Sequence, residues 1–282
     1  MRSISSISEL KNALNTFFNK KKSIGFAPTM GALHQGHLSL VNRSTSENDI
    51  SVVSIFVNPL QFNNESDLNA YPRVIEDDLR LLEQAGVDIA FIPEREELYP
   101  QKPSINIGFG EMEKVLEGEY RPGHFGGVGL VVSKLFNLVQ PDRAYFGLKD
   151  LQQFLLIKKM VHDLNFQVEI IGVDTVREES GLAMSSRNRR LSDKGIDVAS
   201  NIYRGLKLFE KGVLSKDSLT TISEEVLKFY NSIHGLEIEY FQIVDPVDLK
   251  PLSSYPKNEL AACVAGYVEG VRLIDNLYLQ LK

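Results

Sequence analysis

The stretch SIGFAPTMGALHQGHLSLVNRS, residues 23–44, contains three different patterns in succession. Residues 23–27 are mostly apolar and include β-branched and aromatic side chains, which is typical of a buried parallel strand. A connection with one proline and two glycines follows over residues 28–36. From His37 onward, apolar residues recur at the three- and four-residue spacing of a helix. The stretch therefore predicts the first half of a strand–helix–strand unit.

The same alternation continues through the first part of the chain. Further strands are predicted at residues 50–57, 87–92, 144–147 and 168–173. Helices are predicted at residues 37–48, 74–86, 126–139 and 150–164. Strands and helices that alternate at this spacing predict an α/β fold with a Rossmann-like, doubly wound parallel sheet.

The pattern changes after about residue 176. Two helical segments, residues 193–212 and 216–233, follow one another, and alternating strand candidates come next at residues 237–245 and 259–276. Helices followed by strands predict a smaller α+β domain at the carboxyl terminus. We place the domains at residues 1–176 and 177–282, although the boundary could lie anywhere between Val173 and Leu191.

The composition is that of a soluble globular protein. Hydrophobic residues make up 43% and charged residues 24% of the 282 residues, and the apolar runs are too short to cross a bilayer. Residues 1–18 predict an amphipathic helix rather than a secretory signal. The single cysteine, Cys263, excludes a disulfide within the chain, fits a reducing cytoplasm and is expected in the core. The net charge of −6 argues against a nucleic-acid partner.

Two of the five histidines, His34 and His37, stand where the first predicted strand passes into its helix. In open parallel sheets, ligands bind beyond the carboxyl ends of strands, where free N–H groups and the helix dipole favour an anion. Residues three apart at the start of a helix share a face, so both imidazoles can point at one ligand. Gly31 and Gly36 allow the backbone to approach closely. These features indicate a phosphate site.

Other interpretations of the histidine pair stay open: solvated loop residues, half of a zinc site, or core histidines with internal partners. The remaining possible zinc ligands, Cys263, His124, His162 and His234, show no matching close spacing. The glycines match neither G-x-G-x-x-G nor G-x-x-x-x-G-K-[ST], which disfavours a conventional NAD site and a P-loop.

Polar residues also follow two other predicted strands. SIFVNPLQF, residues 54–62, places Asn58 and Gln61 in a loop where neutral amides could recognise a hydroxyl or carboxylate. An asparagine beside a proline is equally ordinary turn chemistry. YFGLKDLQQ, residues 145–153, places Lys149 within reach of a phosphate, although Lys149 could be a surface charge and Asp150 a helix cap.

A fourth segment, GLAMSSRNRRLS at residues 181–192, combines two hydroxyls with a guanidinium at Ser185, Ser186 and Arg187. This combination suits a mobile phosphate clamp, and the alternative is a solvated hinge. Arg189 and Arg190 are interpreted as solvated charges, and Ser192 is expected to cap the next helix.

Taken together, these motifs resemble the pantoate–β-alanine ligase family. HQGH, residues 34–37, is similar to the HIGH motif of the nucleotidylyl-transferase superfamily, and MSSRN, residues 184–188, to its KMSKS loop. The order and spacing of the following stretches extend the resemblance from about Ile24 to Asn276: PTMGALHQGHLSLV, VSIFVNPLQF, YPR, LEGEYRPGHF, KLFNLVQPD, FGLKDLQQ and RLIDN. It is thinner in the carboxyl-terminal third. Gly126, Leu148 and Met184 depart from the commoner family residues.

The resemblance implies a nucleotidylyl-transferase type of sheet and an AMP-forming ligase of the coenzyme A pathway. In such an enzyme ATP and (R)-pantoate form pantoyl adenylate and pyrophosphate with Mg²⁺, and β-alanine then displaces AMP to give pantothenate. A cytoplasmic homodimer is implied as well, with neither a membrane nor a nucleic acid as partner.

Site residues follow from the same resemblance. His34, His37 and Lys149 would act on the phosphates, and the residue matching His37 is described as the family's proton donor. The implied ATP site comprises Met30, Gly31, Ala32, Leu33, His34, Gln35, Gly36, His37, Gly147, Leu148, Lys149, Asp150, Val176, Met184, Ser185, Ser186 and Arg187. The implied substrate site comprises Gln61, Gln153, Asn58, Tyr71 and Arg121, and Gln61 could also meet β-alanine. No direct metal ligand is implied, although Asp77 or Asp78 could hold metal-bound water.

Three competing functions differ in what they need. Transfer of AMP to a phosphorylated acceptor would need additional cations, whereas Gln61 and Gln153 are neutral. A tRNA-binding protein would need a basic extension, which is missing from this sequence. An inactive nucleotide-binding module would have no need of His34, His37 and Lys149.

Overall fold

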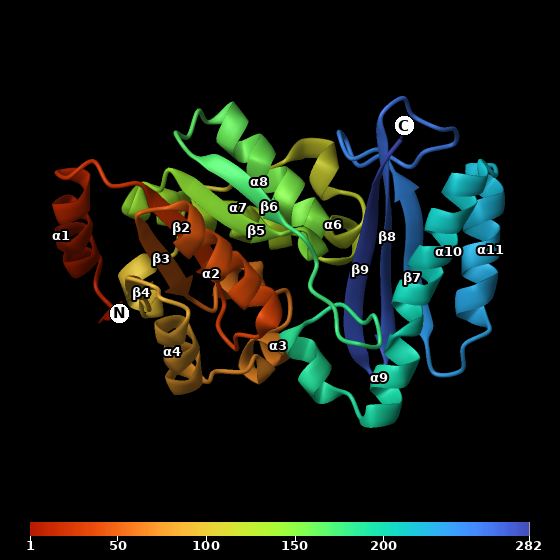
Figure 1. Ribbon diagram of the computed structural model, residues 1–282, viewed down its shortest axis with the longest axis horizontal. Helices are drawn as coiled ribbons and strands as arrows, with labels where there is room; N and C mark the ends of the chain where they lie inside the picture. The colour runs from red at the N-terminus through yellow and green to blue at the C-terminus, as the bar shows by residue number, and fades with distance from the viewer. Residues whose placement is uncertain (282) are drawn as a thin grey trace.

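A parallel sheet forms the larger half of the molecule (Figure 1). The computed structural model describes residues 1–281, and within them this sheet has six strands in the order β1-β4-β3-β2-β5-β6. The strands are β1 (Arg2–Ile4), β2 (Ile24–Thr29), β3 (Ile50–Ile55), β4 (Ile89–Phe91), β5 (Arg143–Gly147) and β6 (Glu169–Val173). The strand order reverses between β2 and β5, as in doubly wound sheets. The predicted fold class is confirmed.

Helices cover both faces of this sheet because successive strand residues point to opposite sides. Phe26 and Phe146 pack with α1 (Ile7–Phe18), α7 (His124–Val139) and α8 (Leu151–Asp163). Ala27 and Tyr145 pack on the other face with α2 (Gln35–Glu47) and α4 (Ile75–Gln84). The short helical segments are η1 (Pro59–Gln61), α3 (Glu65–Ala70), α5 (Arg95–Leu98), η2 (Gly110–Glu113), α6 (Glu117–Tyr120), η3 (Leu148–Asp150) and η4 (Ser186–Arg190).

The prediction of one helix over residues 1–18 was wrong at its start. Residues Arg2–Ile4 form β1, which pairs in parallel with β4, and α1 begins only at Ile7. Ser6 separates the two elements because its hydroxyl caps the helix by accepting a hydrogen bond from the Glu9 N–H. The partner of β1 lies far along the chain, so a three-residue strand leaves no local pattern to find.

The carboxyl-terminal part contains helices followed by strands, as predicted. Helices α9 (Asp193–Ala199), α10 (Asn201–Ser215) and α11 (Leu219–Asn231) precede β7 (Glu237–Val244), β8 (Glu259–Val268) and β9 (Val271–Gln280). These strands form an antiparallel sheet in the order β7-β8-β9. The predicted helix over residues 193–212 is divided at Ser200, and the predicted strand region 259–276 is a hairpin that turns at Glu269 and Gly270. The Ser192 hydroxyl caps α9, as expected.

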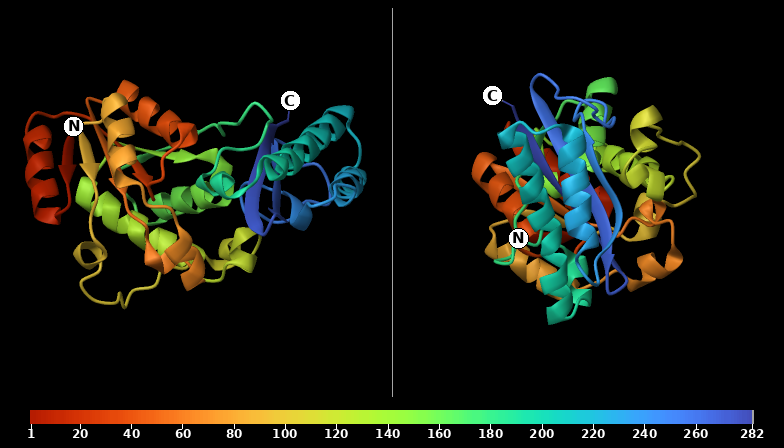
Figure 2. Two further views of the ribbon diagram at one scale, coloured as in Figure 1. Left: turned by 90° about the horizontal axis from the view of Figure 1, so that it is seen from below. Right: turned by 90° about the vertical axis from the view of Figure 1, so that its right-hand side faces the viewer.

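The two sheets lie side by side along the length of the molecule (Figure 2). One face of the β7–β9 sheet is covered by α10 and α11 (Figure 1). Its other face packs against the larger part through a buried cluster that includes Leu116, Leu151, Tyr240 and Cys263. Cys263 is a core residue, as predicted. Residues 174–192 connect β6 to α9, the first helix of the carboxyl-terminal part, and the predicted domain division between residues 176 and 177 falls in this connection.

Candidate functional site

A cavity of about 220 Å³ opens at the carboxyl ends of β2 and β5. In the described chain these two strands pair only at Gly25–Arg143 and Phe26–Ala144. Beyond that point Pro28, Thr29, Phe146 and Gly147 line the cavity instead of pairing across it. Doubly wound proteins bind their ligands at such a reversal of strand order, so the fold itself indicates this cavity as the site.

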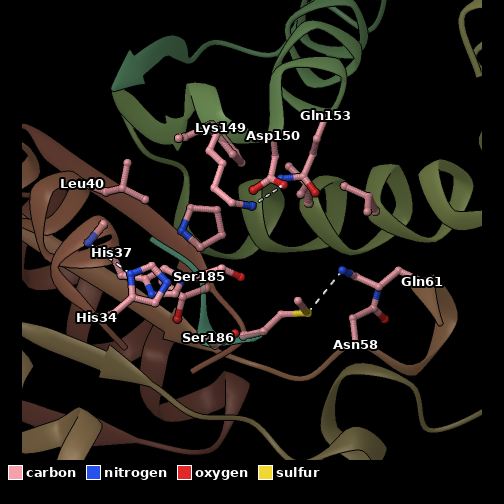
Figure 3. A pocket seen from close by; sticks show the side chains of 18 of the residues that line it. His34, His37, Leu40, Asn58, Gln61, Lys149, Asp150, Gln153, Ser185 and Ser186 are labelled. Carbon is pink, nitrogen blue, oxygen red and sulfur yellow. Dashed lines mark hydrogen bonds and ion pairs between the residues drawn. The ribbon is translucent and has the colours of Figure 1, made fainter. Parts of the chain in front are cut away.

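His34 and His37 lie together at one end of the cavity (Figure 3). Their ring centroids are 4.1 Å apart. His34 is the N-cap of α2, and its Nδ1 accepts a hydrogen bond of 3.1 Å from the Gly36 N–H. The Nδ1 of His37 is buried and has no hydrogen-bond partner among the described residues. A buried ring atom without a protein partner is unusual, and it marks His37 as a candidate for a functional role.

Both imidazoles are neutral at pH 7. Burial lowers the pKa of His34 to about 4, with smaller contributions from the charges of Lys149 and Arg189. Burial lowers the pKa of His37 to about 3, helped by His34 and Lys149. The pair can therefore donate N–H hydrogen bonds to an anion while both rings are uncharged.

Asp78 of α4 holds the loop between β2 and α2 through hydrogen bonds to the loop backbone. The two carboxylate oxygens of Asp78 accept hydrogen bonds from the N–H groups of Ala32, at 2.9 Å, and Leu33, at 2.7 Å. Gly31 and Ala32 have positive φ angles of 79° and 50°. A Cβ atom on Gly31 would lie 2.9 Å from Asp78 Oδ2, so this position requires glycine on both counts.

This arrangement corrects two expectations. Asp77 and Asp78 do not line the cavity: Asp77 is exposed and pairs with Arg80, and Asp78 binds the loop backbone. Neither is placed to hold metal-bound water in the cavity. The N–H groups of Ala32 and Leu33 point to Asp78 and not to a ligand. Five residues of the implied ATP site stay outside the cavity lining, namely Gly31, Ala32, Leu33, Gln35 and Leu148.

Lys149 and Asp150 reach the cavity from η3, the turn that follows β5 (Figure 3). The Lys149 ammonium lies 3.5 Å from the Asp150 carboxylate. Asp150 occupies the N-cap position of α8, but within the described residues its side chain makes no capping hydrogen bond. Its alternative interpretation as a cap is therefore not supported. Gln153 enters the cavity from the first turn of α8.

Asn58 and Gln61 lie at the end of the cavity opposite the histidines (Figure 3). The Asn58 amide donates to Gln61 Oε1 at 3.0 Å and to the Gly127 carbonyl at 3.1 Å, and it accepts from the Tyr99 hydroxyl. The Gln61 amide donates to Met30 Sδ at 3.3 Å. Asn58 is therefore engaged by the protein and orients Gln61, while the NH₂ group of Gln61 has the thioether of Met30, a weak acceptor, as its partner.

His124 belongs to the site although the sequence suggested it only as a possible zinc ligand. It is buried and lines the cavity, with Nδ1 2.7 Å from the Gln61 carbonyl oxygen and Nε2 3.2 Å from Arg121. Since a carbonyl only accepts, Nδ1 carries the proton and Nε2 accepts from Arg121. Burial lowers the pKa of His124 to about 4, helped by the charge of Arg121. The sequence feature that could have indicated this role is the position of His124 three residues after Arg121 in the RPGHF stretch.

The connection of residues 174–192 forms a further wall of the cavity. Met184 N–H donates to the Val176 carbonyl, so these two residues lie side by side, and Ser185 caps η4. Arg187 forms an ion pair of 3.3 Å with Asp67 of α3, and the Tyr71 hydroxyl lies 3.5 Å from that of Ser186. The sequence missed the apolar wall of the cavity, which consists of Phe56, Phe62, Val128, Val131, Val132 and Leu135. Most of these come from α7, which is apolar around much of its circumference.

Two absences hold for residues 1–281. No cluster of three or more His, Cys, Asp or Glu side chains is arranged to hold a metal ion. No helix in the same range combines the length and apolar character that a membrane span requires.

The chain is similar to known proteins over nearly its full length. A family model described as pantoate-beta-alanine ligase matches residues 2–278. The pantothenate synthetase of Cytophaga hutchinsonii is 48% identical over 283 residues, covering 100% of both chains, and that of Bacteroides thetaiotaomicron is 45% identical, covering 98% of both. The crystal structure of pantothenate synthetase from Thermus thermophilus has a TM-score of 0.93 at 44% identity, with 98% of this chain and 99% of that chain covered.

A second solved structure has ligands bound. The pantoate-beta-alanine ligase of Francisella tularensis, complexed with beta-gamma ATP and beta-alanine, has a TM-score of 0.80 at 36% identity. The comparison covers 98% of this chain and 97% of that chain.

Proposed function

The chain belongs to the pantoate–β-alanine ligase family and is an ATP-dependent ligase that makes pantothenate, and we propose that it does so in two steps through pantoyl adenylate. In the first step a pantoate carboxylate oxygen attacks the α-phosphorus of ATP, and the bond to the departing pyrophosphate breaks. In the second step the β-alanine amine attacks the activated carbonyl, loses a proton, and AMP leaves. A free carboxylate has a poor leaving group, and adenylation supplies a good one.

One observation carries this proposal: the cavity has a histidine end, with a lysine nearby, and an amide end opposite it (Figure 3). Lys149 and the histidine pair lie toward the first end, and Gln61 lies at the second. Two reactants bound at these ends would meet in the middle. Catalysis of phosphoryl transfer is mainly positioning and neutralisation of charge, and the cavity provides groups for both.

At the histidine end, we propose that ATP phosphates are bound by His34, His37 and Lys149. The ATP-site residues that line the cavity support this assignment: Met30, His34, Gly36, His37, Gly147, Lys149, Asp150, Val176, Met184, Ser185, Ser186 and Arg187. Phosphate charge beside the imidazoles would oppose the lowering of their pKa values, because a nearby negative charge favours the protonated form. The geometry is thus compatible with His37 as either a hydrogen-bond donor or a proton donor.

At the amide end, we propose that Gln61 and Gln153 bind pantoate. Pantoate has a carboxylate, two hydroxyls and two methyl groups on one carbon, and the cavity offers amides beside the apolar side chains of α7. Asn58 and His124 then act on Gln61, through its side chain and its carbonyl respectively. Tyr71 and Arg121 also line the cavity, and we assign them to its substrate end.

We propose that Mg²⁺ enters bound to ATP. Magnesium commonly keeps several waters and is held by substrate phosphates with one or two carboxylates. Asp150 and Asp174 are carboxylates in the cavity lining and would hold its hydration shell. The ion would neutralise phosphate charge.

The resemblance to the family is the support for a proposal on assembly and location. We propose a homodimer in the cytoplasm, and light scattering on the purified chain tests the dimer.

The proposed sequence of steps is tested by measuring pyrophosphate. ATP and pantoate without β-alanine should release about one pyrophosphate per enzyme molecule rapidly, because the adenylate stays bound. Adding β-alanine should give many turnovers. If pyrophosphate appeared only when β-alanine was present, the separate adenylation step would be refuted.

Changing Gln61 to alanine should impair the use of pantoate more than the use of ATP. We expect KM for pantoate to rise at least about tenfold, because a hydrogen bond to a charged group is lost. Steady-state kinetics with each substrate varied in turn measures the difference. The matched control is Asn63→Ala, since Asn63 is an exposed amide near Gln61 and donates to the Pro122 carbonyl. Equal rises in both KM values would contradict the assignment.

Changing Asp78 to asparagine should weaken ATP use. Asparagine has the same shape, but its NH₂ group would face one of the two loop N–H donors, which leaves the loop with one hydrogen bond fewer. We expect KM for ATP to rise about tenfold with little change for pantoate. The control is Asp77→Asn, which alters the exposed neighbour that pairs with Arg80. Similar kinetics for the two variants would show that Asp78 does not support ATP binding through the loop.

A further inference from the structure

Strand β9 carries two neighbouring polar side chains, Asp275 and Asn276, in the interior of the protein. They are 4% and 7% exposed. Neighbouring residues of a strand point to opposite faces of a sheet. Asn276 accordingly faces the parallel-sheet part of the molecule, and Asp275 faces the connection and the C-terminal helices. Both belong to the RLIDN stretch, and neither lines the main cavity.

Asn276 binds the turn that carries Lys149. Its side-chain amide donates to the carbonyl oxygens of Leu148, at 2.9 Å, and Lys149, at 2.7 Å. An amide NH₂ group has two hydrogens, so these two bonds use both of them. The turn is η3, which leaves β5 at the cavity. The backbone position of Lys149 is therefore tied to the C-terminal sheet.

Asp275 binds Arg177, which belongs to the connection of residues 174–192 that forms another wall of the cavity. Its carboxylate accepts from both terminal nitrogens of Arg177, at 2.6 and 3.0 Å, and the Arg177 guanidinium lies 3.8 Å from the centre of the Tyr203 ring. Arg177 pairs through its backbone with Ala183. This pairing lies next to the Val176–Met184 hydrogen bond, so it fixes the start of the wall formed by residues 184–187.

The contacts of Asn276 and Asp275, here called the two anchors, are also joined to each other. The Asn276 N–H donates to Asp275 Oδ1 at 2.8 Å, and Arg177 reaches the Asn276 carbonyl at 3.5 Å. A displacement of one anchor is therefore transmitted to the other over two adjacent residues. Such buried, fully bonded networks have little freedom to adjust.

We propose that Asp275 and Asn276 are positioning residues for ATP, which set the Lys149 turn and the wall of residues 176–187 at the separation that the phosphates require. This inference rests on the proposed function. It gives the C-terminal sheet a part in adenylation, although these two residues touch neither substrate. Adenylation should therefore depend on an interdomain hydrogen bond that lies outside the reacting groups.

The test is Asn276→Ala, which removes both donors to the turn. We expect KM for ATP, and the Kd of a non-hydrolysable ATP analogue measured by calorimetry, to rise about tenfold, while KM for pantoate changes less than about twofold. The matched control is Tyr278→Phe. Tyr278 is two residues further along β9 on the same face, its hydroxyl bonds Glu259, and it lies outside the cavity lining. Tyr278→Phe should behave like the wild type.

A purely structural role would give a different result. Asn276→Ala would then lower the melting temperature and leave the analogue Kd unchanged, and this outcome overturns the proposal, as would equal rises for ATP and pantoate. If the alanine variant does not fold, Asn276→Ser, which retains one donor, should show a smaller loss of the same kind, and an unchanged Kd overturns the proposal. A wild-type enzyme that releases no pyrophosphate from ATP and pantoate would refute the proposed function instead, while the calorimetric comparison would still report on Asn276.

Discussion

Replacing His37 by alanine should slow pyrophosphate release from ATP and pantoate by about 100- to 1,000-fold, the range found when one transition-state hydrogen-bond donor is removed. His37 lines the cavity with its ring centroid 4.1 Å from that of His34, and we expect its imidazole to donate a hydrogen bond to the phosphates. Burial keeps the pKa of His37 at about 3, so the free enzyme holds it as a neutral donor. Single-turnover measurement with quenched samples gives the rate directly.

The control for this variant is another histidine. His162 lies on α8 with its side chain 88% exposed, so His162→Ala makes the same chemical change away from the cavity. It should retain the wild-type rate. Circular dichroism should give the same folded spectrum for both variants. A wild-type single-turnover rate in His37→Ala would show that the imidazole does not act on the phosphates.

Replacing Lys149 by methionine should reduce the rate of adenylate formation at least about 100-fold, because a cation that would stabilise charge on the transferring phosphoryl group is lost. Methionine keeps an unbranched apolar stem like that of lysine and lacks the ammonium. In this structure the ammonium has a carboxylate, Asp150, only 3.5 Å away, and its charge also lowers the pKa values of His34 and His37. Pre-steady-state pyrophosphate release measures the rate.

The same variant has a second, independent readout. Removing the charge of Lys149 should raise the pKa of His34 above about 4, but not to its ordinary value, because burial is the larger cause of the shift. An NMR titration of the imidazole measures this. The control is Lys159→Met, since Lys159 pairs with Asp163 on α8 away from the cavity. If Lys149→Met left both the rate and the His34 pKa unchanged, Lys149 would not act at the histidine end.

The apolar periodicity predicted most of the fold because it reports which face of each element is buried, and burial is the main force behind these elements. The strands from β2 to β6 and both helical layers follow from it. β1 could not be found, since three residues show no period and their partner β4 is distant in the sequence. The break of the predicted helix at Ser200 likewise leaves no proline or glycine as a signal.

The candidate site divides in the same way. The sequence could place residues at strand ends, such as His34, Lys149 and Gln61, beside one cavity because parallel strands bring their carboxyl ends to one edge of the sheet. Asp77 or Asp78 was considered for holding metal-bound water, and the structure shows Asp78 bound to the loop backbone instead. His124 was missed as a site residue, because only packing shows that its ring meets the Gln61 carbonyl.

The sequence alone determined the layers of this protein, the edge of the sheet where its site lies and the family to which its motifs are similar. Tertiary structure decided how the site is supported: Asp78 under the loop, His124 behind Gln61, and Asn276 on the Lys149 turn. Periodicity and motif spacing are properties of neighbouring residues. A hydrogen bond between residues more than a hundred positions apart, such as Asn276 to Lys149, depends on how complete elements pack, and no local pattern records it.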